Sequence, residues 1–82
     1  MVTVHREDGF RFAIYRNDHE PAHVHAIKDG ETIVNLVGSD GRPELRESMG
    51  ATKADIRKVL RIVAERRAYL LAKWKEIQDG TD

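Results

Sequence analysis

The chain has 82 residues, no net formal charge and no cysteine. A chain of this length buries only about 60% of the surface that its unfolded form exposes, so we expect one domain over residues 1–82 that gains stability from a homodimer or a partner protein. The lack of cysteine excludes disulfides and thiolate chemistry. Because no apolar stretch approaches the roughly 18 residues of a membrane span, we expect a cytoplasmic protein that does not contact a membrane.

The two halves of the chain differ in charge. Residues 1–50 contain six basic and nine acidic side chains, whereas residues 51–82 contain eight and five. A solvated helix is the usual explanation of such a basic segment, and a nucleic-acid-binding surface is the alternative. The absence of an overall basic excess favours the solvated helix.

A first β-hairpin is predicted from residues 2–7 and 10–15, which flank Asp8-Gly9. Asp-Gly between two alternating runs indicates a two-residue turn, because both turn positions need a positive φ. This turn places His5 opposite Phe12 and Thr3 opposite Ile14. The alternation then predicts a core face that carries Phe10, Phe12 and Ile14.

A second hairpin is predicted from residues 23–28 and 31–37, around Asp29-Gly30. A two-residue turn there sets three pairs: Ile27 with Thr32, His25 with Val34, and His23 with Leu36. Alternation places both histidines on one face, with Val24, Ala26, Ile33 and Val37 on the other. Both faces carry apolar residues, so the pattern leaves open which face a helix covers.

Turn-forming residues dominate residues 38–50, where Glu44–Glu47 is a candidate for a further short strand. A long C-terminal helix follows, with Thr52 as its cap and Asp55 three residues later. At 100° per residue its apolar stripe consists of Ile56, Val59, Leu60, Val63, Leu70, Leu71, Trp74 and Ile77. We therefore expect an α+β fold: a small antiparallel sheet of two β-hairpins, about four strands, packed by one long C-terminal helix.

Arg67 falls in the middle of this apolar stripe. An unpaired buried charge costs several kcal/mol, so the position needs an explanation. Either the side chain extends past the edge of the core, or the helix bends near Arg66 and Arg67, or Arg67 pairs with Asp18 or Glu20.

The opposite, polar face of the helix carries two apolar residues, Ile62 and Tyr69. Isolated exposed apolar residues are normal. Together with the nearby cations they also define a candidate surface for a partner or a phosphate, whose residues are Arg66, Arg67, Tyr69 and Lys73.

The densest chemistry lies in residues 17–25, which hold three of the four histidines. His23 and His25 can present two imidazoles to one divalent metal ion, with a third ligand from His19 or from a carboxylate of Asp18 or Glu20. These nitrogen and oxygen donors suit zinc, manganese, iron or nickel.

Two other interpretations of the cluster remain open. In a metal-free hydrolase or ribonuclease, the general acid and base would come from His19, His23, His25 and Glu20, and Arg66 or Arg67 would hold a phosphate. Alternatively, the histidines only satisfy hydrogen bonds where a strand begins, or they form part of a protein-binding surface.

Three stretches, residues 6–12, 15–25 and 62–74, resemble a family of small bacterial proteins, the domain-of-unknown-function family four-one-six-zero. The most specific part is its Glu-Pro-x-His-Val-His core, and the family motif corresponds to Asn17, Glu20, Pro21, His23 and His25. The resemblance implies no established catalytic residues. It implies a gene placed beside that of a second small protein, in an arrangement like that of toxin–antitoxin pairs. Residues 28–46 depart from the family pattern.

We therefore expect an interaction protein of a toxin–antitoxin-like pair, which acts through a small protein partner or self-association. The alternatives are a metal-dependent or histidine-based hydrolase or ribonuclease centred on the histidine cluster, and a nucleic-acid-binding regulator that uses the basic helix.

Overall fold

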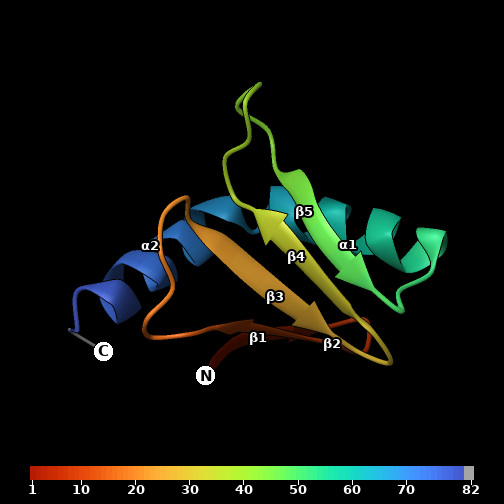
Figure 1. Ribbon diagram of the computed structural model, residues 1–82, viewed down its shortest axis with the longest axis horizontal. Coiled ribbons are helices and arrows are strands. Elements are labelled where there is room, and N and C mark those ends of the chain that lie inside the picture. The colour runs from red at the N-terminus through yellow and green to blue at the C-terminus, as the bar shows by residue number, and fades with distance from the viewer. Residues whose placement is uncertain (81–82) are drawn as a thin grey trace.

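A five-stranded antiparallel sheet with two helices on one face forms the fold, as the computed structural model shows for residues 1–80 (Figure 1). The strands follow one another across the sheet in the order of the sequence. Their bounds are β1 Val2–Glu7, β2 Phe10–Ile14, β3 His23–Ile27, β4 Glu31–Asn35 and β5 Glu44–Met49, and the helices are α1 Lys53–Glu65 and α2 Arg67–Gln78. The predicted α+β class is confirmed. The prediction of two hairpins and one long helix is imprecise. The candidate strand at Glu44–Glu47 forms β5 and extends the sheet, and the helix is broken at Arg66.

The helices pack on the face of the sheet that carries Phe12. Phe10, Phe12 and Ile14 are buried there, as predicted, against three residues of α1 and three of α2: Val59, Ile62, Val63, Leu70, Trp74 and Ile77. Burial of this apolar surface is the main favourable contribution to folding. Val24 and Ala26 of β3 belong to the same core. Because side chains alternate along a strand, His23 and His25 lie on the opposite face of the sheet.

The first turn forms as predicted, and the strands that it joins contain one irregularity. Asp8 and Gly9 both have positive φ, at 53° and 84°, and His5 pairs with Phe12. Thr3, however, pairs with Ala13 instead of Ile14, because the register shifts between Thr3 and His5. A β-bulge of this kind adds one residue to one strand, and the alternation alone does not reveal it.

The second hairpin has a register one residue away from the predicted one. Its pairs are Ile27 with Glu31, His25 with Ile33, and His23 with Asn35. The loop between the paired residues Ile27 and Glu31 has three residues instead of two. Gly30 does not have the positive φ that the predicted two-residue turn requires. It allows instead a close approach of the backbone. A Cβ at this position would lie 2.5 Å from the carbonyl oxygen of Met49. Because a shift of one residue turns every side chain of a strand to the other face, Thr32, Val34 and Leu36 enter the core.

The helical segment begins as predicted and breaks at Arg66. Thr52 caps α1 by accepting a hydrogen bond from the backbone N–H of Asp55, at 3.0 Å. Arg66 leaves the helical conformation with φ −107° and ψ 14°, and α2 begins at the next residue. The predicted bend near Arg66 and Arg67 is therefore confirmed. The placement of Ile62 on a polar face is wrong, because its side chain is fully buried.

Within residues 1–80, neither helix is long and apolar enough to cross a lipid bilayer.

Truncation of Ile62 tests its corrected position. Since the side chain is fully buried, Ile62→Ala should lower the free energy of unfolding by about 2–5 kcal/mol, through lost burial and the cavity left behind. Urea denaturation followed by circular dichroism measures this change. The control is Lys58→Ala on the exposed side of α1, for which we expect a change within about 0.5 kcal/mol. Equal effects of the two substitutions would contradict the packing described here.

Candidate functional site

The loop between β2 and β3 brings Asp18 over the open face of β3. Its Oδ2 accepts a hydrogen bond from the backbone N–H of Tyr15, at 3.1 Å, and its own backbone N–H donates to the carbonyl of Tyr15, at 3.2 Å. The second bond closes a β-turn over residues 15–18, and the side chain of Asp18 bonds back to the first residue of that turn. The carboxylate of Asp18 is thereby fixed in one orientation.

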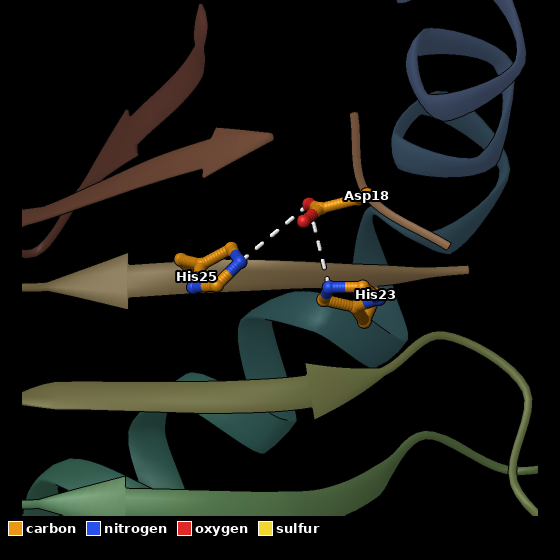
Figure 2. Close-up of side chains that lie close together, drawn as sticks. All are labelled: Asp18, His23 and His25. Carbon is orange, nitrogen blue, oxygen red and sulfur yellow. Dashed lines mark ion pairs between the residues drawn. The ribbon is translucent and has the colours of Figure 1, made fainter. Parts of the chain in front are cut away.

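His23 and His25 point toward this carboxylate from alternate positions of β3 (Figure 2). The Nε2 atom of His23 lies 3.3 Å from Oδ2 of Asp18, and that of His25 lies 3.6 Å from the same oxygen. The two imidazole centroids are 5.3 Å apart. The prediction that both rings share one face is confirmed, and we call Asp18, His23 and His25 the acidic–histidine triad.

The other ring nitrogen of each histidine has its own acceptor. Nδ1 of His23 lies 2.8 Å from the carbonyl oxygen of Pro21, and Nδ1 of His25 lies 2.7 Å from Oε2 of Glu31. Neither a carbonyl nor a carboxylate can donate, so both Nδ1 atoms carry the hydrogen. The Nε2 atoms of both rings are therefore directed at Asp18.

Aromatic side chains enclose the two imidazoles. The ring of Tyr15 meets His25 edge-on, with centroids 4.5 Å apart, and Trp74 of α2 lies 5.1 Å from His23. Only 7% of the His23 side chain and 10% of the His25 side chain are exposed, against 16% for Asp18. The two imidazoles are therefore largely shielded from water.

The structure brings together only part of the predicted cluster. Asp18, His23 and His25 meet, whereas His19 and Glu20 are exposed on the loop and are not members of the compact group of donor atoms. Glu31 was not predicted as part of the site. The predicted register paired Ile27 with Thr32, which places the side chain of Glu31 on the sheet face opposite His25. The contacts of Tyr15 and Trp74 with the histidines were not predicted either. The positions of aromatic residues in the sequence do not by themselves indicate such contacts.

Next to the triad lies an open pocket of about 430 Å³, lined by Glu20, Pro21, Ala22, Val37, Leu71, Trp74 and Lys75. Trp74 forms part of its wall and also contacts His23, so the indole separates the pocket from the triad. Glu20 of the family motif therefore faces the pocket, and His23 and His25 face Asp18.

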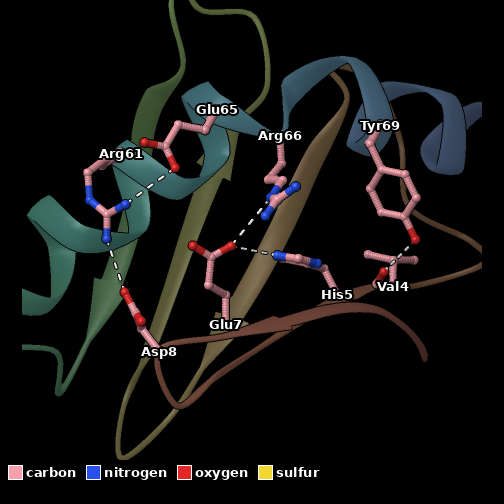
Figure 3. Close-up of polar contacts among 8 residues, drawn as sticks. All are labelled: Val4, His5, Glu7, Asp8, Arg61, Glu65, Arg66 and Tyr69. Carbon is pink, nitrogen blue, oxygen red and sulfur yellow. Dashed lines mark hydrogen bonds and ion pairs between the residues drawn. The ribbon is translucent and has the colours of Figure 1, made fainter.

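The predicted partner or phosphate surface at the helix junction makes contacts within the chain (Figure 3). Nε of Arg66 lies 3.4 Å from Oε1 of Glu7, and the hydroxyl of Tyr69 donates to the carbonyl of Val4 at 2.7 Å. Lys73 lies over the ring of Tyr69, 5.8 Å from its centroid. A role of these residues in binding a partner or a phosphate stays a prediction.

Arg67 does not form the expected link from the helix to the histidine loop. Its guanidinium donates to the carbonyl of Gly41, in the connection between β4 and β5. The alternative that Arg67 pairs with Asp18 or Glu20 is therefore wrong. Because α2 starts at Arg67, the residue lies at a helix end and its half-buried side chain reaches a polar loop.

Glu7 is held in its charged form by two neighbours. The hydrogen bond from His5, at 2.8 Å, is the larger influence, and Arg66 is the second. Together they lower the pKa of Glu7 below its ordinary value of 4.5, because both contacts favour the carboxylate.

The fold and the triad define a small α+β domain with two histidines and a carboxylate gathered on an open sheet face. Residues 9–75 match the family described as a domain of unknown function, DUF4160. The chain belongs to this family. Searches of curated proteins and of solved structures found no significant match.

The lowered pKa of Glu7 predicts a pH-dependent stability difference. The folded protein holds Glu7 deprotonated more strongly than the unfolded chain does, so this contribution is complete above the ordinary pKa of 4.5 and is lost as the pH falls through the lower folded value. The urea midpoint of Glu7→Gln should thus lie below that of the wild type at pH 7, with the gap narrowing toward pH 3. Glu47→Gln on β5 controls for the loss of a carboxylate. A gap that stays constant over this range would contradict the assignment.

Proposed function

We propose that this chain is the protein-binding component of a two-protein system of the toxin–antitoxin type, and that it binds its partner by adding a strand to β5. The observation that carries the proposal is the difference between the two edges of the sheet. An exposed edge strand presents a row of unpaired backbone N–H and C=O groups, to which another chain can hydrogen-bond.

The edge at β1 is occupied by side chains from the helices. Tyr69 donates to the carbonyl of Val4, which lies at the register shift of this strand. Arg66 and Arg61 contact Glu7 and Asp8, with the latter pair 3.0 Å apart (Figure 3). Bulges, charges and covering helices are the usual means by which proteins protect an edge strand from pairing.

Among the described residues, the edge at β5 is less covered than the edge at β1, although α1 contacts this strand. This strand pairs on one side with β4 and ends the sheet on the other, and all six of its residues are exposed. Leu45 and Met49 are 40% and 48% exposed, although both are large and apolar. A strand of this length with exposed apolar side chains is a suitable acceptor for an extended segment.

The charges of β5 indicate which segment fits. Glu44 and Glu47 pair with β4 residues of the histidine-bearing face, Asn35 and Ile33, so their carboxylates lie along that face. Opposite charges across neighbouring strands are favourable, and like charges are unfavourable. We therefore commit to an extended partner segment in which basic residues face Glu44 and Glu47 and an apolar residue faces Met49.

The toxin–antitoxin part of the proposal is supported by the family resemblance, which implies a neighbouring gene for a second small protein. The helix contacts favour a protein over a nucleic acid as the partner. Arg61 and Arg66 are already paired with Asp8 and Glu7, so less positive charge is available for the phosphate contacts on which nucleic-acid affinity depends.

Co-expression with the product of the neighbouring gene tests the proposal. We expect a complex that co-elutes in size-exclusion chromatography with light scattering, and about a tenfold or greater loss of affinity, worth about 1.4 kcal/mol or more, for the double variant Leu45→Lys, Met49→Lys. The matched control is Val37→Lys, since Val37 is 49% exposed but lies outside β5. The control should bind as the wild type does.

Three results would overturn the proposal. The first is that the neighbouring gene product does not bind. The second is that only Val37→Lys weakens binding, which would place the partner at the pocket that Val37 lines. The third is a particle of twice the 9.4 kDa chain mass that the double variant dissociates, since β5 would then be occupied by a second copy.

A further inference from the structure

We propose that Asp18, His23 and His25 bind one divalent transition-metal ion, and that Glu31 and the carbonyl of Pro21 orient the two imidazoles for this purpose. The inference stands apart from the proposed protein partner. It uses a different set of residues, from β3, β4 and the loop before β3, whereas the proposed partner adds to the outer edge of β5.

The first support is the spacing of the donor atoms. One donor atom from each of the three residues lies within 4.8 Å of the other two, and the two distances to Oδ2 of Asp18 are 3.3 and 3.6 Å. In a tetrahedral shell with metal–ligand bonds of about 2.1 Å, neighbouring donor atoms are about 3.4 Å apart. Two of the three donor separations in the triad are therefore close to the value that a bound ion requires.

The second support is a conflict among hydrogen-bond acceptors. With hydrogen on both Nδ1 atoms, as their partners Pro21 and Glu31 require, each neutral imidazole presents a lone pair at Nε2. In this neutral form, two lone pairs and a carboxylate oxygen converge with no hydrogen between them. A cation at their centre removes this repulsion, either a proton on Nε2 or a metal ion, and neutral imidazole is a common metal ligand in proteins.

The third support is the environment of His25. Its Nε2 is buried and has no hydrogen-bond partner among the described residues, because Asp18 at 3.6 Å is beyond hydrogen-bond distance. A buried polar atom without a partner costs about 1–3 kcal/mol. Coordination of a metal would satisfy this atom at its present position.

The contacts behind the ligands match those of known metal centres. A metal-binding histidine almost always donates its second ring N–H to a carboxylate or a backbone carbonyl, which fixes the orientation of the ring. His25 uses the carboxylate of Glu31 and His23 the carbonyl of Pro21. Both types of orienting partner are thus present in one site.

The donor set identifies the class of metal. Two imidazole nitrogens and one carboxylate oxygen suit zinc, iron, nickel or copper, and they do not suit magnesium or calcium, which prefer all-oxygen shells. Three protein ligands leave at least one position for water or an external ligand. With neutral imidazoles, the charges of Asp18 and Glu31 balance those of a divalent ion.

Zinc titration of untagged, chelator-treated protein tests the inference by isothermal calorimetry. We expect one ion per chain and a rise of the melting temperature with added zinc, because a ligand that binds only the folded state stabilises it. Asp18→Asn should abolish both effects. Glu31→Gln should weaken binding about 10- to 100-fold, as expected for loss of an orienting partner.

His19→Ala and His5→Ala are the matched controls, since each removes a histidine outside the triad, and both should bind zinc as the wild type does. Circular dichroism of Asp18→Asn shows whether the variant is folded. If it is not folded, two measurements on the wild type test the inference instead. The visible absorption of added Co²⁺ reports its binding, and ¹⁵N NMR of the imidazoles reports the binding of Zn²⁺. The inference would be overturned if the wild type shows no saturable binding or if His19→Ala loses binding. It would also be overturned if NMR shows hydrogen on both nitrogens of His23 and His25 in the presence of zinc.

Discussion

The pairing register between β3 and β4 is the constraint on which the rest of the structure depends. With Ile27 opposite Glu31, Val34 and Leu36 enter the core and the carboxylate of Glu31 reaches His25. A shift of one residue would expose Val34 and Leu36 to water and remove that carboxylate from the imidazole. Core packing and the geometry of the triad therefore both depend on this backbone pairing, and a change of register would disrupt both.

The fold could be predicted from the sequence wherever a local pattern determines it. Asp8-Gly9 has the turn chemistry of a tight hairpin, and Thr52 with Asp55 has that of a helix cap, so both are confirmed. Asp29-Gly30 has the same letters, but Gly30 is required by its contact with Met49 and Gly50. This contact joins residues about twenty positions apart in the sequence, so a local sequence pattern cannot reveal it.

The triad was predictable only in part, for a related reason. Alternation along one strand is enough to place His23 and His25 together, and the short loop limits the choice of a third residue to its own few side chains. The selection of Asp18 over His19 depends on the loop conformation, which the hydrogen bonds between Asp18 and Tyr15 determine. Whether the carboxylate of Glu31 reaches His25 depends on the register of β4. Hydrogen bonds within the loop decided the first outcome and pairing between strands the second, and propensities within a strand encode neither.

The triad and its orienting groups come from one short piece of chain, from Tyr15 to Glu31. From α2, Trp74 contacts His23 and Gln78 donates a hydrogen bond to the carbonyl of Tyr15. Contacts of such low sequence separation require the closure of small loops only, so little chain entropy is lost in assembling them. The histidine-bearing hairpin is therefore nearly a self-contained unit in the topology. Sequence changes in most of the helical layer can alter the stability of the domain while the arrangement of these side chains stays the same.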